Sequence, residues 1–146
     1  MLAIEFPAYN FSIRQQQGKE YIFDTIRKKW VRLTPEEWVR QNVIQYLLQV
    51  KQYPSSLLAI EKEIQLGELK KRCDIVVYKN AEPWMIIECK EMNVPLSEAV
   101  FMQAIRYNLA NCCTYIIISN GNSSKGWHLQ NGSATEIDNL PLWESA

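Results

Sequence analysis

Two carboxylates and one lysine are the residues whose types and spacing could carry chemistry in this sequence. Asp74 lies early in a run rich in β-branched and aromatic residues, and Glu88 and Lys90 lie at the end of the next such run. Residues 79–83 between the runs are typical of a turn, so the pair predicts a β-hairpin. If the hairpin is centred on Ala81, Asp74 lies opposite Glu88 on one sheet face, and Lys90 shares that face.

This arrangement would suit a divalent metal. Opposed residues have Cβ atoms roughly 4.5–5.5 Å apart, and two carboxylates at that separation repel unless a cation neutralises them. Mg²⁺ is a hard cation that proteins hold through one or two carboxylates while it keeps several waters. Lys90 could then position or activate a water, or stabilise negative charge developing on a phosphate. The alternative is a surface hairpin whose Glu88 and Lys90 are ordinary exposed residues, and spacing alone does not separate the two.

The elements before the hairpin should position these residues. Thr34 as N-cap, Pro35 at the first helical position and Glu37 in a capping box predict a helix that runs to about Lys51. Its apolar residues recur mostly at spacings of three and four, which predicts a core-facing stripe. A strand should follow over residues 57–66, with one buried face.

The segment just before Asp74 is basic. Residues 67–72 should turn the chain, and this turn holds Lys70, Lys71 and Arg72, where a phosphate would have to be received. Ordinary solvation of a basic turn is the alternative.

The second half of the chain predicts a crossover. A helix over about residues 98–111 should lead to a buried strand at 113–119, parallel to a strand of the hairpin. Residues 126–129 predict a last edge strand, and the polar tail from Gly132 should be weakly ordered. Near the N-terminus, residues 21–23 and 30–33 predict a small hairpin with a basic tip, whereas residues 1–18 look irregular.

Composition restricts the classes of protein. The 146 residues are 47% hydrophobic, enough for a single domain spanning 1–146 with its own core. Sixteen basic residues balance sixteen acidic ones, so any nucleic-acid contact must come from local patches. No apolar run approaches the ~20 residues of a membrane span, and residues 1–9 do not resemble a signal peptide, so we expect a cytoplasmic protein. The four cysteines lack CxxC spacing and predict no zinc site.

Three segments carry a resemblance to a known superfamily. Asp74 followed by Glu88-Cys89-Lys90 resembles the D…(D/E)xK pattern of the PD-(D/E)xK nucleases. Gln103 and Tyr107 match the QxxxY element that accompanies this core in some branches. Residues 33–41 resemble the start of the nuclease domain at the N-terminus of type I restriction enzyme R subunits. The likeness runs from about residue 23 to residue 127.

The resemblance implies a fold and an activity. The fold would be α/β and restriction-endonuclease-like, a mixed sheet of about four core strands flanked by helices, with a peripheral N-terminal hairpin and a core over about residues 23–130. The activity would be Mg²⁺- or Mn²⁺-dependent hydrolysis of phosphodiester bonds, in DNA. The partners would be DNA and other restriction-system subunits or a motor protein, although the chain itself has no GxxxxGK[ST] phosphate loop.

The resemblance also implies roles for individual residues. Asp74 and Glu88 would bind the metal, Lys90 would assist the attacking water, and Gln103 and Tyr107 would support the site. Glu37 is the candidate for an additional acid, which its capping role explains equally well, and Arg106 is a candidate DNA contact. A rival hypothesis from another class is a non-catalytic module that keeps the fold and binds nucleic acid or protein.

Overall fold

The computed structural model describes residues 1–66, 68–97, 99 and 113–143. The helix predicted over residues 98–111 therefore lies almost entirely outside the described residues. Gln103, Arg106 and Tyr107 belong to that segment, and their predicted roles stay predictions.

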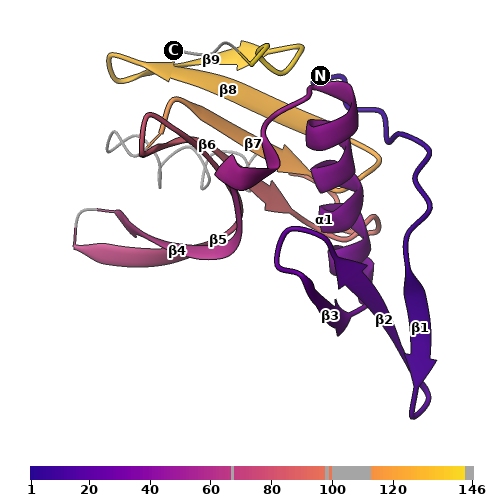
Figure 1. Cartoon of the computed structure of the whole chain (residues 1–146). Coiled ribbons are helices and arrows are strands. Elements are labelled where there is room, and N and C mark those ends of the chain that lie inside the picture. Colours follow the sequence, from indigo (N-terminus) through magenta and orange to yellow (C-terminus); the bar gives the residue numbers. More distant parts are fainter. Residues whose placement is uncertain (67, 98, 100–112, 144–146) are drawn as a thin grey trace.

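A six-stranded mixed sheet forms the centre of the molecule (Figure 1). Its strands lie in the order β4, β5, β6, β7, β8, β9, and only β6 and β7 run parallel to each other. They are β4 (Leu58–Leu66), β5 (Leu69–Lys79), β6 (Glu82–Cys89), β7 (Tyr115–Ser119), β8 (Ser124–Gln130) and β9 (Ser133–Ile137). The α/β class, the central hairpin and the parallel β6–β7 pair are confirmed. The expected number of core strands was too low.

The end of the sheet differs from the prediction. β8 is not an edge strand, because β9 pairs with it in antiparallel register from Gly126–Ile137 to Gln130–Ser133. Four of the five β9 side chains are exposed, so this strand has no apolar pattern in the sequence and arises from main-chain pairing. The expectation of a weakly ordered tail from Gly132 was wrong for this segment.

A separate three-stranded antiparallel sheet lies at the N-terminal side. It contains β1 (Ile13–Gln16), β2 (Lys19–Asp24) and β3 (Lys29–Arg32). The β2–β3 hairpin confirms the prediction, whereas β1 was missed because all four of its side chains are exposed. Gln17 and Gly18, at φ 54° and 75°, form the tight turn between β1 and β2.

Helix α1 (Pro35–Gln45) joins the two sheets. Thr34 is its N-cap, and the Thr34 Oγ1 accepts a hydrogen bond of 3.1 Å from the backbone N–H of Glu37. The helix continues as a π-helical turn (Tyr46–Val50), and a 3₁₀ turn (Ser55–Leu57) leads into β4. The predicted helix start is confirmed, and its end near residue 50 agrees with the prediction.

The core lies between α1 and the large sheet. Val39, Val43, Ile44 and Leu47 of the helical segment pack in one cluster with sheet residues that include Ile75, Val77, Met85, Ile87 and Ile117. Each fully buried aliphatic side chain contributes roughly 1.5–3 kcal/mol. Two smaller clusters contain Val76 with Ile86 and Ile116 with Ile118. β5, β6 and β7 are therefore buried on both faces of the sheet. No helix among the described residues is long and apolar enough to cross a membrane.

Candidate functional site

The β5–β6 hairpin has the register expected from the sequence. Ile75 pairs with Ile87, Val76 with Ile86 and Val77 with Met85, as a hairpin centred on Ala81 requires. The register shifts by one residue between Val77 and Tyr78, where the strands close on a turn whose Asn80 and Ala81 have φ values of 53° and 64°. The shift lies on the turn side of these pairs, so it leaves the Asp74 end of the hairpin in register.

Both strands of the β4–β5 pair change face close to Asp74. Ile60 and Ile75 pair with each other and pack in the core under α1. Ile64 and Cys73 instead belong to the smaller cluster that contains Val76 and Ile86. Residues at even spacing share a face in a regular strand, so the change must occur between these positions. It coincides with Glu61, whose φ is 51°. The regular alternation that the sequence predicted for β4 is therefore interrupted at the candidate site.

Two hydrogen bonds hold the Asp74 carboxylate where β4 and β5 change face. Its Oδ2 accepts a hydrogen bond of 2.7 Å from the backbone N–H of Cys89, and its Oδ1 accepts one of 3.2 Å from Nη1 of Arg40. The Asp74 side chain is only 18% exposed. A main-chain donor on one oxygen and a guanidinium on the other fix the plane of the carboxylate.

Glu88 is the neighbour of Asp74 across the hairpin, as predicted. Burial raises the pKa of Glu88 to about 7, and the negative charge of Asp74 with a shared side-chain hydrogen bond raises it as well. Lys71 opposes these effects by donating a hydrogen bond from Nζ to Glu88 Oε1. Near neutral pH, Glu88 is thus divided between its protonated and ionised forms, because burial and the charge of Asp74 outweigh the effect of Lys71.

Lys90 and Glu36 are two further charged residues of the site. The backbone N–H of Lys90, one residue beyond β6, donates to the carbonyl of Ser119 at 2.9 Å and so ties this end of β6 to β7. Partial desolvation raises the pKa of Glu36, and the charge of Asp74 raises it further, whereas the charges of Arg40 and Lys90 lower it. Glu36, in the first turn of α1, is therefore within electrostatic reach of both Asp74 and Lys90.

The additional acid predicted from the helix was Glu37. The structure directs the Glu37 carboxylate to Arg27, Arg40 and Gln41, each at 3.0 Å. Glu36 is the acid of this helix whose pKa responds to Asp74, and sequence reasoning missed it because the capping pattern drew attention to its neighbour.

Arg40 is the most connected side chain at the site. Its side chain is 7% exposed and binds both oxygens of Glu37 at 3.0 Å, through Nε and Nη2. Its remaining contacts are with Glu61 Oε1 at 3.2 Å and with Asp74 Oδ1 at 3.2 Å. No role for Arg40 was apparent in the sequence, since Asp74 lies 34 residues further along the chain.

The predicted basic turn is in fact part of β5. Lys71 contacts Glu88, Arg72 contacts Glu61 at 3.1 Å, and Lys70 lies 3.8 Å from Glu63. Lys70 and Arg72 are each 70% exposed, whereas Lys71 is only 25% exposed. Two of the three residues predicted to receive a phosphate therefore remain open to solvent, and the third neutralises the carboxylate pair.

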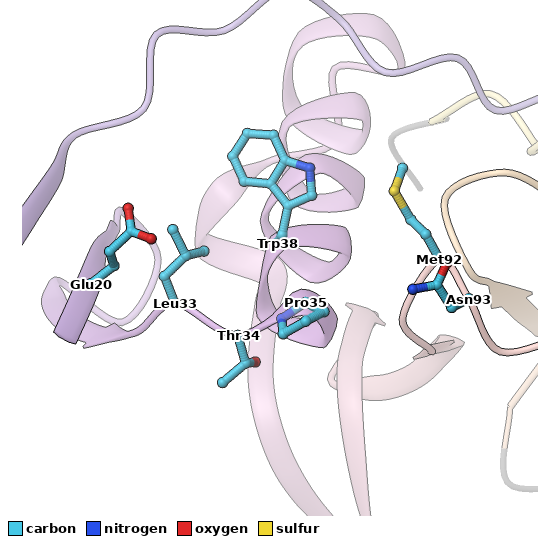
Figure 2. A pocket seen from close by; sticks show the side chains of 7 residues that line it. All are labelled: Glu20, Leu33, Thr34, Pro35, Trp38, Met92 and Asn93. Atoms are coloured by element: carbon cyan, nitrogen blue, oxygen red, sulfur yellow. The ribbon is translucent and has the colours of Figure 1, made fainter.

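A pocket of about 420 Å³ lies at the start of α1 (Figure 2). One wall comes from β2, the link between β3 and α1, and the start of α1, and the other comes from the loop that follows Lys90. Most of the lining is apolar, and it consists of Glu20, Leu33, Thr34, Pro35, Trp38, Met92 and Asn93. Pro35 directly precedes Glu36, so the pocket opens at the end of α1 that contains Glu36.

Asp74 and Glu88 are the residues that could hold a magnesium ion. Among the described residues, no group of three or more His, Cys, Asp and Glu side chains is placed to hold a metal. Mg²⁺ needs only one or two carboxylates, because waters and substrate oxygens supply its other ligands. Asp74 and Glu88 would be those ligands, since a carboxylate has about four acceptor positions and the contacts described above use only some of them.

These features define an α/β domain with a nuclease-like mixed sheet and an acidic pair at one end of its central hairpin. The chain belongs to the family described as Type I restriction enzyme R protein N terminus (HSDR_N), whose model matches residues 35–141. The match begins at α1 and includes the whole β5–β6 hairpin. Comparisons with curated proteins and with solved structures gave no match.

Proposed function

We propose that this chain is a Mg²⁺- or Mn²⁺-dependent nuclease that hydrolyses phosphodiester bonds in DNA. The observation that carries this proposal is the pair Asp74 and Glu88, placed together at the end of a buried hairpin with the pKa of Glu88 raised to about 7. Membership of a family named for restriction enzyme R proteins gives the pair a nuclease-related context.

Each residue of the site would have a distinct task. Asp74 and Glu88 would hold the metal, which when bound supplies a Lewis acid for the phosphate. Glu88 would bind as the ionised form and release its proton. Lys90 would position the attacking water or stabilise the negative charge that develops on the phosphate. Gln103 and Tyr107 would support the site from the segment that follows.

The surface around the site suits a nucleic-acid strand. Lys70 and Arg72 are exposed on β5, the strand that contains Asp74, and can exchange their acidic partners for phosphates. Trp38 and Met92 offer an apolar wall in the pocket at the start of α1, against which a base can stack. Because the chain has no net charge, other restriction-system subunits or a motor protein would deliver the DNA, in the cytoplasm.

Cleavage assays on single- and double-stranded DNA and RNA test the proposal. The wild type, Asp74→Ala, Glu88→Ala and Lys90→Ala would be compared at low salt with millimolar Mn²⁺ or Mg²⁺, with and without EDTA. We expect cleavage by the wild type that EDTA and each substitution abolish, while Lys90→Ala keeps most of its metal binding. Glu63→Ala is the matched control, because Glu63 is an exposed acid of β4 that contacts Lys70.

One observation favours the rival hypothesis of a non-catalytic binding module. Lys71 and Arg40 already give Glu88 and Asp74 cationic partners, so the pair has a structural explanation. Metal-independent nucleic-acid binding that survives Asp74→Ala and Glu88→Ala, without cleavage of any substrate, would favour that module. Equal calorimetric binding of Mn²⁺ by the wild type and Asp74→Ala would remove Asp74 from the metal site.

A further inference from the structure

Three carboxylates meet at the point where β4 and β5 change face. In the β4–β5 ladder, Ile60 pairs with Ile75 and Lys62 with Cys73, so Glu61 occupies the position across from Asp74. Glu88 adjoins Asp74 from the other side, on β6. The sheet therefore presents acids from three neighbouring strands at one place, and like charges so arranged repel one another.

Arg40 separates two of these acids. Its Nη2 donates to Glu61 and its Nη1 to Asp74, both at 3.2 Å, so one guanidinium lies between the two carboxylates. The backbone of Glu61 is in the left-handed region at φ 51°, which is unfavourable for a non-glycine residue. A strained backbone at the very residue that meets Arg40 points to a geometry maintained by its surroundings.

Glu37 holds the guanidinium of Arg40 in place. Glu37 accepts two parallel hydrogen bonds from Arg40, a fork that fixes the plane of the guanidinium. Arg27 and Gln41 donate to Glu37 in turn, each at 3.0 Å. Arg40 thus enters the site in a single orientation, with its free edge turned to Glu61 and Asp74.

We propose that Arg40 is a positioning residue that orients Asp74 for metal binding and keeps Glu61 out of the metal pair. This inference rests on the proposed function, because it assumes that a metal binds at Asp74. The contact between Arg40 and Asp74 can be tested in metal-free protein. Arginine suits this task because its planar fork binds Glu37 on one edge and still reaches two further acids. A lysine keeps the charge and loses the fork.

The first experiment uses the backbone N–H of Cys89 as a reporter in metal-free protein. This N–H donates to Asp74 Oδ2 at 2.7 Å, so its proton resonance in a ¹⁵N-labelled sample responds to the orientation of Asp74. We expect an upfield shift in Arg40→Lys and no change in Arg72→Lys. Arg72 is the matched control, because it contacts Glu61 from the exposed side. A Cys89 resonance that is unmoved in folded Arg40→Lys would overturn the inference.

The second experiment measures Mn²⁺ affinity by calorimetry. Arg40→Lys keeps the local charge, so the loss of orientation should lower the affinity, by about tenfold as for other residues that support metal ligands. Glu61→Gln should bind Mn²⁺ as tightly as the wild type. If Glu61→Gln instead loses affinity as Asp74→Ala does, Glu61 is a ligand and the inference is wrong.

The outcomes distinguish this inference from the proposed function. A wild type that binds no Mn²⁺ contradicts the metal site, while the Cys89 resonance still decides whether Arg40 holds Asp74. If Arg40→Lys does not fold, Glu61→Gln decides: an unshifted Cys89 resonance with unchanged Mn²⁺ affinity supports the inference, and a change in either contradicts it.

Discussion

Glu88 is the residue whose chemistry depends most on pH. In the unfolded chain its pKa should be near the ordinary value of 4.5, and in the folded protein burial and Asp74 raise it to about 7. Between these values the unfolded state carries the charge while the folded state keeps the proton. The folded state therefore binds more protons, and its stability must fall as the pH rises through this window.

Replacing Glu88 by Gln should remove this pH-dependent cost. The difference between pKa values of about 7 and 4.5 corresponds to about 3 kcal/mol above pH 7, and this value already includes the opposing effect of Lys71. We expect the midpoint of thermal unfolding of Glu88→Gln to rise relative to the wild type as the pH increases from 5 to 8. Glu63→Gln, at an exposed acid, is the control. Parallel pH profiles for Glu88→Gln and the wild type would contradict the raised pKa.

At the scale of elements, Asp24 joins the small sheet to α1. Its side chain is fully buried at the end of β2, and its Oδ1 accepts hydrogen bonds from the backbone N–H groups of Ile26 and Arg27 at 2.8 and 2.7 Å. Its Oδ2 accepts from Arg27 Nε at 2.7 Å and from Gln41 Nε2 at 2.9 Å. One carboxylate thus closes the β2–β3 turn and fastens it to the helix that carries Arg40.

Asp24→Asn should destabilise the protein, because it removes the charge that pairs with Arg27. Breaking a buried ion pair costs about 3–5 kcal/mol. Burial alone would raise the pKa of Asp24, but the hydrogen bonds from Arg27 and Gln41 outweigh it and lower the pKa. The stabilisation is therefore present above the ordinary pKa of 3.8 and is lost as the pH falls through the lower folded value.

Urea denaturation at several pH values measures this effect. The free energy of unfolding of Asp24→Asn should lie well below that of the wild type at pH 7, and the difference should shrink toward pH 3. Glu20→Gln, at an exposed position of β2, should leave the free energy nearly unchanged. A difference that stays constant with pH would show that Asp24 acts through shape and not through charge.

The elements that the sequence predicted are those whose burial leaves a pattern. The continuous apolar runs of β5 and β6 and the turn between them predict the hairpin register that brings Asp74 and Glu88 together. β1 and β9 were missed because their side chains are mostly exposed and only their main chains pair. The role of Arg40 was hidden for a different reason, since contacts across long stretches of chain leave no local signal.

At the scale of the whole molecule, the pocket at the start of α1 offers a test of how a substrate lies. Stacking of a base on an aromatic side chain contributes about 1–3 kcal/mol. If single-stranded DNA passes through the pocket, Trp38→Leu should weaken its binding, measured by fluorescence anisotropy, about tenfold. Trp30→Leu is the control, because Trp30 packs on Phe23 and Arg14 in the small sheet. Equal losses for both variants would remove Trp38 from the binding surface.

Sixteen positive and sixteen negative charges leave the molecule without net charge, so any DNA affinity must come from a few exposed cations. Lys70 and Arg72 are the exposed pair on β5, the strand that contains Asp74, whereas Lys71 is largely buried against Glu88. The plot of log affinity against log salt concentration has a negative slope. Each phosphate contact that is lost makes this slope less steep by about one. Lys70→Ala and Arg72→Ala should each show this less steep slope together with weaker binding.

Lys19→Ala supplies the control for this measurement, because Lys19 is exposed on β2 of the small sheet. Its slope should equal that of the wild type if DNA binds at the β5 surface. Lys71→Ala should behave differently from both groups, since it removes the cation beside Glu88 and should raise the proton affinity of that carboxyl group. If Lys19→Ala makes the slope less steep by as much as Lys70→Ala does, DNA binds without preference over the whole surface, and the β5 cations have no special part in receiving it.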